Sequence, residues 1–255
     1  MKHYALIGRT LTHSYSKQLF DAQHFVDADY RLCPMPSIDG LHEWVRCEHI
    51  DGFNVTNPYK QAILPLLDDL SAEARAIGAV NCVVVVRDQA IRLIGHNTDA
   101  PAFLHTIHNS PLISHFSFLD SLILGTGGAA RAVAYALGQM GIEYTFVSRS
   151  PECHPDAIGY DKLSTFNFQL STLIVNATPV GTYPDIDCSP LNLSDLRPPT
   201  SDFFVYDLVY NPSPTKLMRQ AAAIGATVCD GMAMLRRQAE LSWQLWGLEL
   251  TPIRV

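Results

Sequence analysis

A short apolar run that leads into a glycine-rich loop is the feature that most restricts how this chain can fold. Residues 122–124 read Leu-Ile-Leu, residues 125–131 read Gly-Thr-Gly-Gly-Ala-Ala-Arg, and an alanine-rich helical pattern continues to Met140. A second apolar run, residues 144–147, completes a strand–loop–helix–strand order. Glycines let the backbone turn tightly and approach a pyrophosphate, which binds the free amides at the helix start. The order predicts a dinucleotide-binding unit; an ordinary strand-to-helix turn is the alternative.

The end of the second strand indicates which dinucleotide to expect. Residues 147–150 read Val-Ser-Arg-Ser. Folds that prefer NAD usually place Asp or Glu there, to hold the ribose 2′-hydroxyl. Arg149 can instead stack on the adenine and pair with a 2′-phosphate, which a carboxylate would repel. We therefore expect NADP as the cofactor; the alternative is a solvated surface arginine.

Apolar β-prone runs alternate with helix-like segments along the whole chain, which is typical of an α/β protein. Besides the two runs above, strands are expected at residues 4–7, 52–56, 79–86, 173–176 and 203–208. We expect two lobes. An N-terminal α/β lobe would span residues 1–99, and a Rossmann-type nucleotide-binding lobe residues 100–230. Residues 231–255 carry a long helical pattern, and we expect this C-terminal helix to pack back on the first lobe and complete it.

Composition and charge exclude several classes of partner. The chain is 47% hydrophobic and 17% charged with a net charge of −7, which describes a globular protein. It has no run of Lys and Arg, so we expect neither nucleic acid nor membrane as a partner. The histidines, including His13 and His96, show no ligand spacing, and we expect no metal site.

The cysteines, the first residues and the lengths of the apolar stretches predict a cytoplasmic protein. The six cysteines are scattered without a Cys-x-x-Cys pair, as expected of reduced thiols. The first residues turn glycine-rich and polar too soon for a signal peptide. No apolar stretch approaches the roughly 20 residues that span a bilayer. We expect a monomer or a homodimer.

Two polar segments of the first lobe precede helical patterns. Ser14 and Ser16 follow the first strand, so their hydroxyls can join free backbone amides in holding a carboxylate. Asp99 stands just before the helix that contains Pro101. For each of the three side chains the alternative is a helix N-cap.

A lysine at a helix start is the third such feature. Asn57 would cap this helix and Pro58 would take its first position, which places Lys60 in the first turn. The positive end of the helix dipole favours neutral lysine there, as an acid/base residue requires. A solvated surface lysine is the alternative.

Taken together, these segments resemble the shikimate dehydrogenase family over nearly the whole chain. The matching stretches, in order, are residues 13–16, 54–60, 79–81, 97–99, the glycine loop from Gly125, 176–181, 207–210, 230–235 and 238–239. The resemblance implies an NADP-dependent oxidoreductase that reversibly reduces 3-dehydroshikimate to shikimate, in the chorismate pathway to aromatic amino acids.

The resemblance also assigns roles to residues. Lys60 and Asp99 would be the catalytic pair. Substrate-binding residues would be Ser14, Ser16, Thr56, Asn81, Tyr210 and Gln238. Cofactor-binding residues would be Gly125, Gly127, Gly128, Ala129, Ser148, Arg149, Ser150, Thr178, Gly231 and Met234.

Three departures from the family pattern bear on these roles. Lys17 replaces the proline usual after the second serine. Cys82 replaces a common threonine beside Asn81. The loop after Arg149 lacks the family's second arginine and carries Glu152, which predicts a weaker phosphate clamp.

Other functions remain open from the sequence. A quinate/shikimate dehydrogenase that also uses NAD would fit the altered adenosine loop. A non-catalytic sensor of a small acid or nucleotide would have no need for Lys60, Asp99 and Gln238 together. Two-lobed dehydrogenases of one-carbon metabolism share the expected architecture but would not need the hydroxyls of Ser14 and Ser16.

Overall fold

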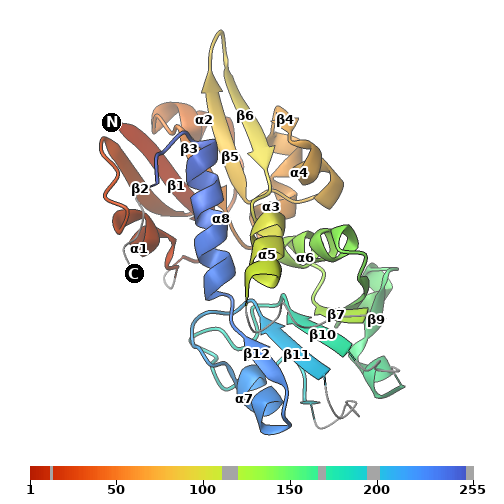
Figure 1. The fold of residues 1–255 in the computed structure, drawn as a ribbon. Helices are drawn as coiled ribbons and strands as arrows, with labels where there is room; N and C mark the ends of the chain where they lie inside the picture. The colour runs from red at the N-terminus through yellow and green to blue at the C-terminus, as the bar shows by residue number, and fades with distance from the viewer. Residues whose placement is uncertain (12–13, 111–119, 166–170, 194–201, 251–255) are drawn as a thin grey trace. The chain divides into compact units, whose positions relative to one another are not determined.

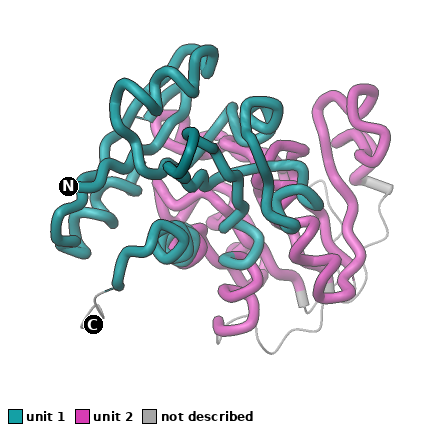
Figure 2. Tube along the Cα trace, turned by 90° about the horizontal axis from the view of Figure 1, so that it is seen from above, with its two compact units in different colours: residues 1–102, 235–255 teal, residues 103–234 magenta. Residues whose placement is uncertain are grey.

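The computed structural model describes residues 1–11, 14–110, 120–165, 171–193 and 202–250. The chain divides into two compact units, drawn in different colours in Figure 2. Unit 1 comprises Met1–Ala102 and Leu235–Val255, and unit 2 comprises Phe103–Met234. Both divisions fall inside helices, α5 (Asp99–Asn109) and α8 (Met232–Leu245). The expected lobe boundaries, residues 99 and 230, lie at or just before the starts of these two helices.

Unit 1 contains a mixed six-stranded sheet of order β2-β1-β3-β5-β6-β4 (Figure 1). Its strands are β1 (Lys2–Gly8), β2 (Ala28–Pro34), β3 (Gly52–Val55), β4 (Asp69–Leu70), β5 (Cys82–Arg87) and β6 (Ile91–His96). Its other helices are α1 (Ser16–Asp21), α2 (Leu41–Cys47), α3 (Tyr59–Ala62), the 3₁₀ turn η1 (Leu64–Leu66) and α4 (Ala72–Ile77).

The strand directions bring several loops to one edge of this sheet. β1 runs parallel to β2 and β3, and β5 is antiparallel to both β3 and β6. The carboxyl ends of β1, β3 and β6 and the start of β5 therefore share an edge. The segments around Ser14, Thr56, Asn81 and Asp99 all leave the sheet there. This topology, which joins strands far apart in sequence, is what assembles a site.

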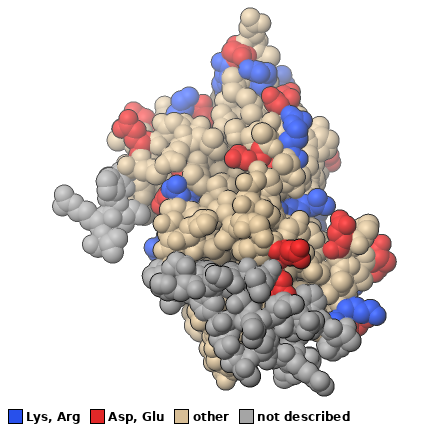
Figure 3. All heavy atoms as spheres, turned by 45° about the vertical axis from the view of Figure 1, so that its right-hand side comes forward, with Lys and Arg blue, Asp and Glu red and all other residues tan. Residues whose placement is uncertain are grey.

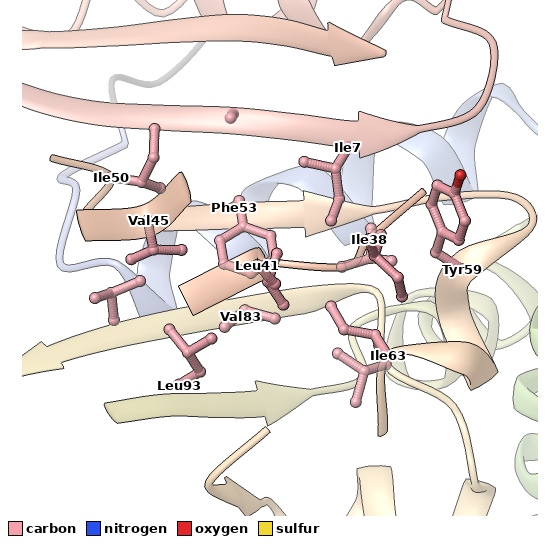
Figure 4. Close-up of a cluster of buried hydrophobic side chains, with 14 of the residues drawn as sticks. Ile7, Ile38, Leu41, Val45, Ile50, Phe53, Tyr59, Ile63, Val83 and Leu93 are labelled. Atoms are coloured by element: carbon pink, nitrogen blue, oxygen red, sulfur yellow. The ribbon is translucent and has the colours of Figure 1, made fainter. Parts of the chain in front are cut away.

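Side chains alternate between the two faces of the unit 1 sheet along each strand. Both faces are buried, each in its own hydrophobic cluster. Ala5 and Ile7 of β1 belong to one hydrophobic cluster, together with residues of α2. Figure 4 shows this cluster, including Phe53, Val83 and Leu41. Tyr4 and Leu6 of β1 face the other way, into a cluster that contains Ala239 and Trp243 of α8. The predicted packing of the C-terminal helix on the first lobe is confirmed.

Unit 2 contains an all-parallel sheet of order β12-β11-β10-β7-β8-β9. Its strands are β7 (Asp120–Leu124), β8 (Glu143–Ser148), β9 (Ala157–Gly159), β10 (Ser171–Asn176), β11 (Asp202–Asp207) and β12 (Thr227–Cys229). Its remaining helices are α6 (Gly128–Gln139), α7 (Lys216–Ala223) and the 3₁₀ turns η2 (Pro151–Cys153) and η3 (Tyr160–Thr165). Counted from β7, the order is the Rossmann order 3-2-1-4-5-6, which confirms the predicted fold. Ligands bind such sheets at the carboxyl ends of the strands, where the order reverses between β7 and β10.

Several strands were not predicted from the sequence, because they are short or contain charged residues. β2, β4, β6, β9 and β12 were not expected, and the expected strand at residues 79–86 begins only at Cys82. Val80 lies outside the sheet because its amide donates to the carbonyl of Lys60, at 2.8 Å. β2 is an edge strand whose buried Tyr30 is flanked by Asp29 and Arg31, so its pattern reads as polar.

The charges are mixed on the face shown in Figure 3, where basic and acidic side chains lie side by side. Arg75 pairs with Asp69 and Arg92 with Asp88, each at 3.0 Å. Among the described residues, no helix is both long and apolar enough to cross a membrane.

Candidate functional site

A buried ion pair lies at the edge where the unit 1 loops meet. Lys60 Nζ donates to Asp99 Oδ2 at 2.7 Å, and the two side chains are only 18% and 7% exposed. A buried carboxylate is stable only when its remaining lone pairs are also used. Asn81 Nδ2 meets this need by donating to Asp99 Oδ1 at 2.9 Å. A protonated lysine has further N–H donors beyond the one given to Asp99, so the pair can also bind a substrate oxygen.

The helix that carries Lys60 begins one residue later than predicted. α3 starts at Tyr59, whose amide closes the turn on the Thr56 carbonyl at 2.9 Å. Pro58 therefore occupies the N-cap position, and Asn57 does not cap the helix. The four residues of α3 form a single turn with few aligned peptide dipoles. The helix end therefore acts on Lys60 less than predicted, and the close charged partner of the lysine is Asp99.

Asp99 is not a helix cap. It is the first residue of α5, and Asn97 Oδ1 accepts from the amides of Asp99 and Ala100, each at 3.1 Å. Asn97 is itself held by its Nδ2, which donates to the Ala79 carbonyl at 2.9 Å. Because Asn97 satisfies the helix start, the Asp99 carboxylate is free to bind Lys60 and Asn81.

Asn81 contacts two of the other predicted site residues, Asp99 and Gln238, and also Thr98. Its Nδ2 lies 2.9 Å from Asp99 Oδ1, 2.8 Å from Thr98 Oγ1 and 3.3 Å from Gln238 Oε1. Its Oδ1 accepts from the Thr98 amide at 2.6 Å. Residues before β5, at the start of α5 and on α8 therefore meet at one amide side chain.

The carboxyl ends of β1 and β3 also approach closely. A Cβ on Gly8 would lie only 2.6 Å from Thr56 Cγ2, so glycine is required for this contact. Ser14 Oγ donates to Ser16 Oγ at 3.2 Å, and both serines are half-buried. Tyr15 stands at the N-cap of α1, so neither serine takes the N-cap position. His13 lies outside the described residues.

In unit 2, the glycine loop leaves the start of α6 open. Gly125 has φ +104°, a conformation that favours glycine, and a Cβ there would lie 3.1 Å from Thr178 Cγ2. Gly127 is the N-cap of α6 in extended conformation, and no side chain caps the helix. A Cβ on Gly127 would meet nothing within 4 Å. The first amides of a twelve-residue helix are therefore available to an anion, as a pyrophosphate site requires.

The loop after β8 carries the residues expected to bind adenosine. Ser148 is buried and its Oγ accepts from the Ser150 amide at 3.1 Å, whereas Arg149 and Ser150 are exposed. Burial raises the pKa of Tyr160, and the positive charge of Arg149 works against that shift.

His154 is a candidate cofactor-binding residue that was not predicted from the sequence. Its Nε2 lies 3.1 Å from Thr126 Oγ1, so it joins the adenosine loop to the glycine loop. The only signal in the sequence is a polar ring a few residues after Arg149, where the family's second arginine is missing.

A buried carboxylate orders the ends of β10 and β11. Thr178 Oγ1 donates to Asn176 Oδ1 at 2.7 Å, and Asn176 Nδ2 donates to Asp207 Oδ1 at 2.8 Å. Asp207 Oδ2 accepts from Thr215 Oγ1 at 2.7 Å. Burial raises the pKa of Asp207, and these donors work against that shift. Tyr210, half-buried, follows β11 in the same strand-end region.

The start of α8 requires a glycine. A Cβ on Gly231 would collide with the backbone of Leu208, whose carbonyl oxygen it would meet first. The Gly231 amide donates to the Val209 carbonyl at 3.2 Å, and Asp230 Oδ1 accepts from the Met232 amide at 3.0 Å. Met234 follows, buried, in the first turn.

We expect Gly231→Ala to lower the free energy of unfolding by about 1–3 kcal/mol, because the methyl group forces the backbone of Leu208 to move. Thermal unfolding without ligands measures this. Gly127→Ala is the matched control, since its Cβ meets open space. Equal melting temperatures for the two variants would contradict the close packing of Gly231.

The described residues hold no group of three or more His, Cys, Asp and Glu side chains arranged to bind a metal ion. His96 is half-buried, and burial lowers its pKa, so its ring favours the neutral form.

The chain is similar to known proteins over nearly its whole length. The family model described as the shikimate dehydrogenase substrate binding domain matches residues 6–83. A shikimate dehydrogenase (NADP(+)) of Carboxydothermus hydrogenoformans is 34% identical, covering 98% of this chain and 93% of the relative. The structure of shikimate 5-dehydrogenase from Thermus thermophilus with NADP(H) and shikimate has a TM-score of 0.81 at 34% identity, covering 99% and 96% of the two chains. Quinate dehydrogenase from Corynebacterium glutamicum in complex with NAD gives 0.77 at 28% identity, covering 98% and 95%.

Proposed function

The chain belongs to the shikimate dehydrogenase family, and we propose that it catalyses the reversible NADPH-dependent reduction of 3-dehydroshikimate to shikimate. The observation that carries the proposal is the buried Lys60–Asp99 pair, held by Asn81 beside Gln238. This constellation provides one proton-transferring group and several donors and acceptors for ring hydroxyls. A sensor that only binds its ligand has no need for an acid/base pair, and this favours an enzyme.

The residues around the glycine loop fit the proposed cofactor. The uncapped start of α6 would bind the pyrophosphate, and exposed Arg149, between Ser148 and Ser150, would bind the adenosine 2′-phosphate. By family resemblance, Thr178, Gly231 and Met234 would lie near the nicotinamide. When bound, NADPH supplies the hydride.

The protein's own part in the reaction is to hold the substrate and move one proton. In reduction, Lys60 Nζ would give a proton to the carbonyl oxygen, and in oxidation it would take the proton from the hydroxyl. Asp99 would accept a hydrogen bond from a neighbouring ring hydroxyl while it holds the lysine in place. The remaining ring hydroxyls would bind Thr56, Asn81 and Gln238.

The substrate carboxylate requires donors outside this pair. Ser14 and Ser16 supply two adjacent hydroxyls at the same edge of the unit 1 sheet, after β1. Their mutual bond is weak at 3.2 Å, so a carboxylate can replace it. By family resemblance, Tyr210 would also contact this carboxylate.

The test is direct. Purified protein is mixed with shikimate and NADP, then with shikimate and NAD, and the absorbance of the reduced nicotinamide is followed. We expect rapid reduction of NADP. Reduction of neither cofactor, with ligands that still raise the melting temperature, would contradict the proposal and favour a sensor.

A second candidate is a quinate/shikimate dehydrogenase that uses NAD. The resemblance to an NAD-bound quinate dehydrogenase and the exposed Glu152, which follows Arg149 in the adenosine loop, favour it. The same assay with quinate separates the two candidates, since comparable rates with quinate and NAD would require the broader function.

We expect His154→Ala to weaken NADP binding about tenfold while NAD binding changes little, because the imidazole would supply a donor in place of the missing arginine. Titration of each cofactor with fluorescence detection gives both dissociation constants. An equal loss for NADP and NAD would mean that His154 only holds Thr126 and the glycine loop.

A further inference from the structure

Three side chains spaced four residues apart face the unit 1 sheet from α8 and the residue that follows it. Gln238 Oε1 accepts from Asn81 Nδ2 at 3.3 Å, and Trp246 Nε1 donates to the Val83 carbonyl at 3.0 Å. Gly52 makes room for the indole, since a Cβ there would lie 2.5 Å from Trp246 Nε1. Ser242 stands between Gln238 and Trp246 and is fully buried. Polar contacts thus set where this helix lies on the sheet.

The hydrogen and both lone pairs of the Ser242 hydroxyl take part in hydrogen bonds. It donates its hydrogen to the Gln238 carbonyl at 2.9 Å, and it accepts from Asn54 Nδ2 at 2.9 Å. It also lies 3.3 Å from Thr98 Oγ1. Because a hydroxyl has one hydrogen and two lone pairs, Thr98 must be the donor in this last contact. Ser242 therefore joins β3, the start of α5 and α8 at one oxygen atom.

Each partner of Ser242 leads to a residue of the proposed site. Asn54 precedes Thr56 on the strand end, and its Oδ1 accepts from the buried hydroxyl of Tyr30 at 2.9 Å. Thr98 precedes Asp99 and accepts from Asn81. The Gln238 carbonyl belongs to the residue whose side chain meets Asn81. A shift of this hydroxyl would move all three segments together.

Position 82 explains why a hydroxyl is needed on the helix. Cys82 faces Asn54 directly across β3 and β5, and both are buried. Burial raises the pKa of Cys82 to about 12, so it is a neutral thiol. A threonine at this position would place a hydroxyl opposite Asn54. A thiol is a much weaker partner for an amide.

We propose that Ser242 is a positioning residue, which supplies from α8 the hydroxyl that Cys82 lacks and thereby holds Gln238 and Asn81 at the Lys60–Asp99 pair. This inference rests on the proposed function. It predicts that a threonine at position 82 can replace the serine at position 242.

The experiment compares four proteins by steady-state kinetics: the wild type, Ser242→Ala, Cys82→Thr and the double variant. We expect Ser242→Ala to lower kcat/KM for shikimate about tenfold, with KM for NADP unchanged. Cys82→Thr alone should stay within about twofold of the wild type, since its hydroxyl adds to an intact network. The double variant should recover most of the loss.

A second comparison tests whether Ser242 acts through Gln238. In a Gln238→Ala background, Ser242→Ala should have a smaller effect than in the wild type, because one of the two side chains that it positions is gone. Ser71→Ala is the control for a purely structural serine, since Ser71 Oγ caps α4 by accepting from the Ala74 amide at 3.1 Å. It should lower the melting temperature and leave kcat/KM unchanged.

Several outcomes would overturn the inference. A lower melting temperature for Ser242→Ala at wild-type kcat/KM would make the serine structural only. Losses that add fully with Gln238→Ala, or no recovery with threonine at position 82, would also overturn it. If Ser242→Ala does not fold, Ser242→Cys, with its weaker donor, should show the same loss to a lesser degree. A wild type without any turnover of shikimate would instead overturn the proposed function, and this inference with it.

Discussion

Lys60→Ala is expected to lower kcat for shikimate oxidation by roughly 10²–10⁴-fold, the usual contribution of a positioned acid/base group. KM for shikimate should change only a few-fold, because the hydroxyls of Ser14 and Ser16 and the Asn81 and Gln238 side chains remain. Loss from kcat and not from binding is the signature of a group that acts in the transition state. Steady-state kinetics over a range of shikimate concentrations measures both constants.

The control must separate chemistry from folding. Removing Lys60 leaves the Asp99 carboxylate, 7% exposed, without its positive partner, and an unpaired buried charge destabilises the fold. Thermal unfolding of the variant shows whether it is folded at the assay temperature. Lys17→Ala removes an exposed lysine that pairs with Asp21 at 2.9 Å, and it should leave kcat unchanged. Near-normal kcat in a folded Lys60→Ala protein would remove the lysine from the mechanism.

Arg149→Asp is expected to lower the ratio of kcat/KM with NADP to kcat/KM with NAD on the order of 100-fold. The substitution removes a charge-assisted bond to the 2′-phosphate and adds a repulsive carboxylate, and this carboxylate can accept from the ribose 2′-hydroxyl of NAD. The weaker binding of NADP and the stronger binding of NAD both lower this ratio. The measurement is kcat/KM for each cofactor at saturating shikimate, at a stated ionic strength because exposed charges are screened.

Arg219→Asp is the matched control, since it introduces the same charge change on α7, where Arg219 is exposed and donates to the Pro214 carbonyl at 2.9 Å. The ratio should stay at the wild-type value in this variant. If Arg149→Asp also leaves the ratio unchanged, another group reads the 2′-phosphate, and His154 beside Thr126 becomes the first to examine.

The local parts of the molecule were predictable from the sequence. The glycine loop, the buried strand before it and the helix after it appear within one residue or two of the expected positions. Hydrophobic periodicity and glycine content act over a few neighbouring residues, so a sequence records them directly. The same holds for the α/β class and for the C-terminal helix. No local pattern distinguished Lys60, Asp99 and Gln238 from surface residues or helix caps. Their roles were predicted because their motifs resemble those of a family.

The tertiary structure alone decided how these residues meet. Asn97, and not Asp99, satisfies the start of α5, which leaves the carboxylate free for Lys60. Asn81 and Gln238 are 157 positions apart, and Asn54 and Ser242 are 188 apart. Such contacts depend on the register of β3 with β5 and on where α8 lies on the sheet. The sequence by itself determined the elements and the chemistry that they carry, whereas the partners of each polar side chain follow from strand pairing between distant segments, which no local pattern encodes.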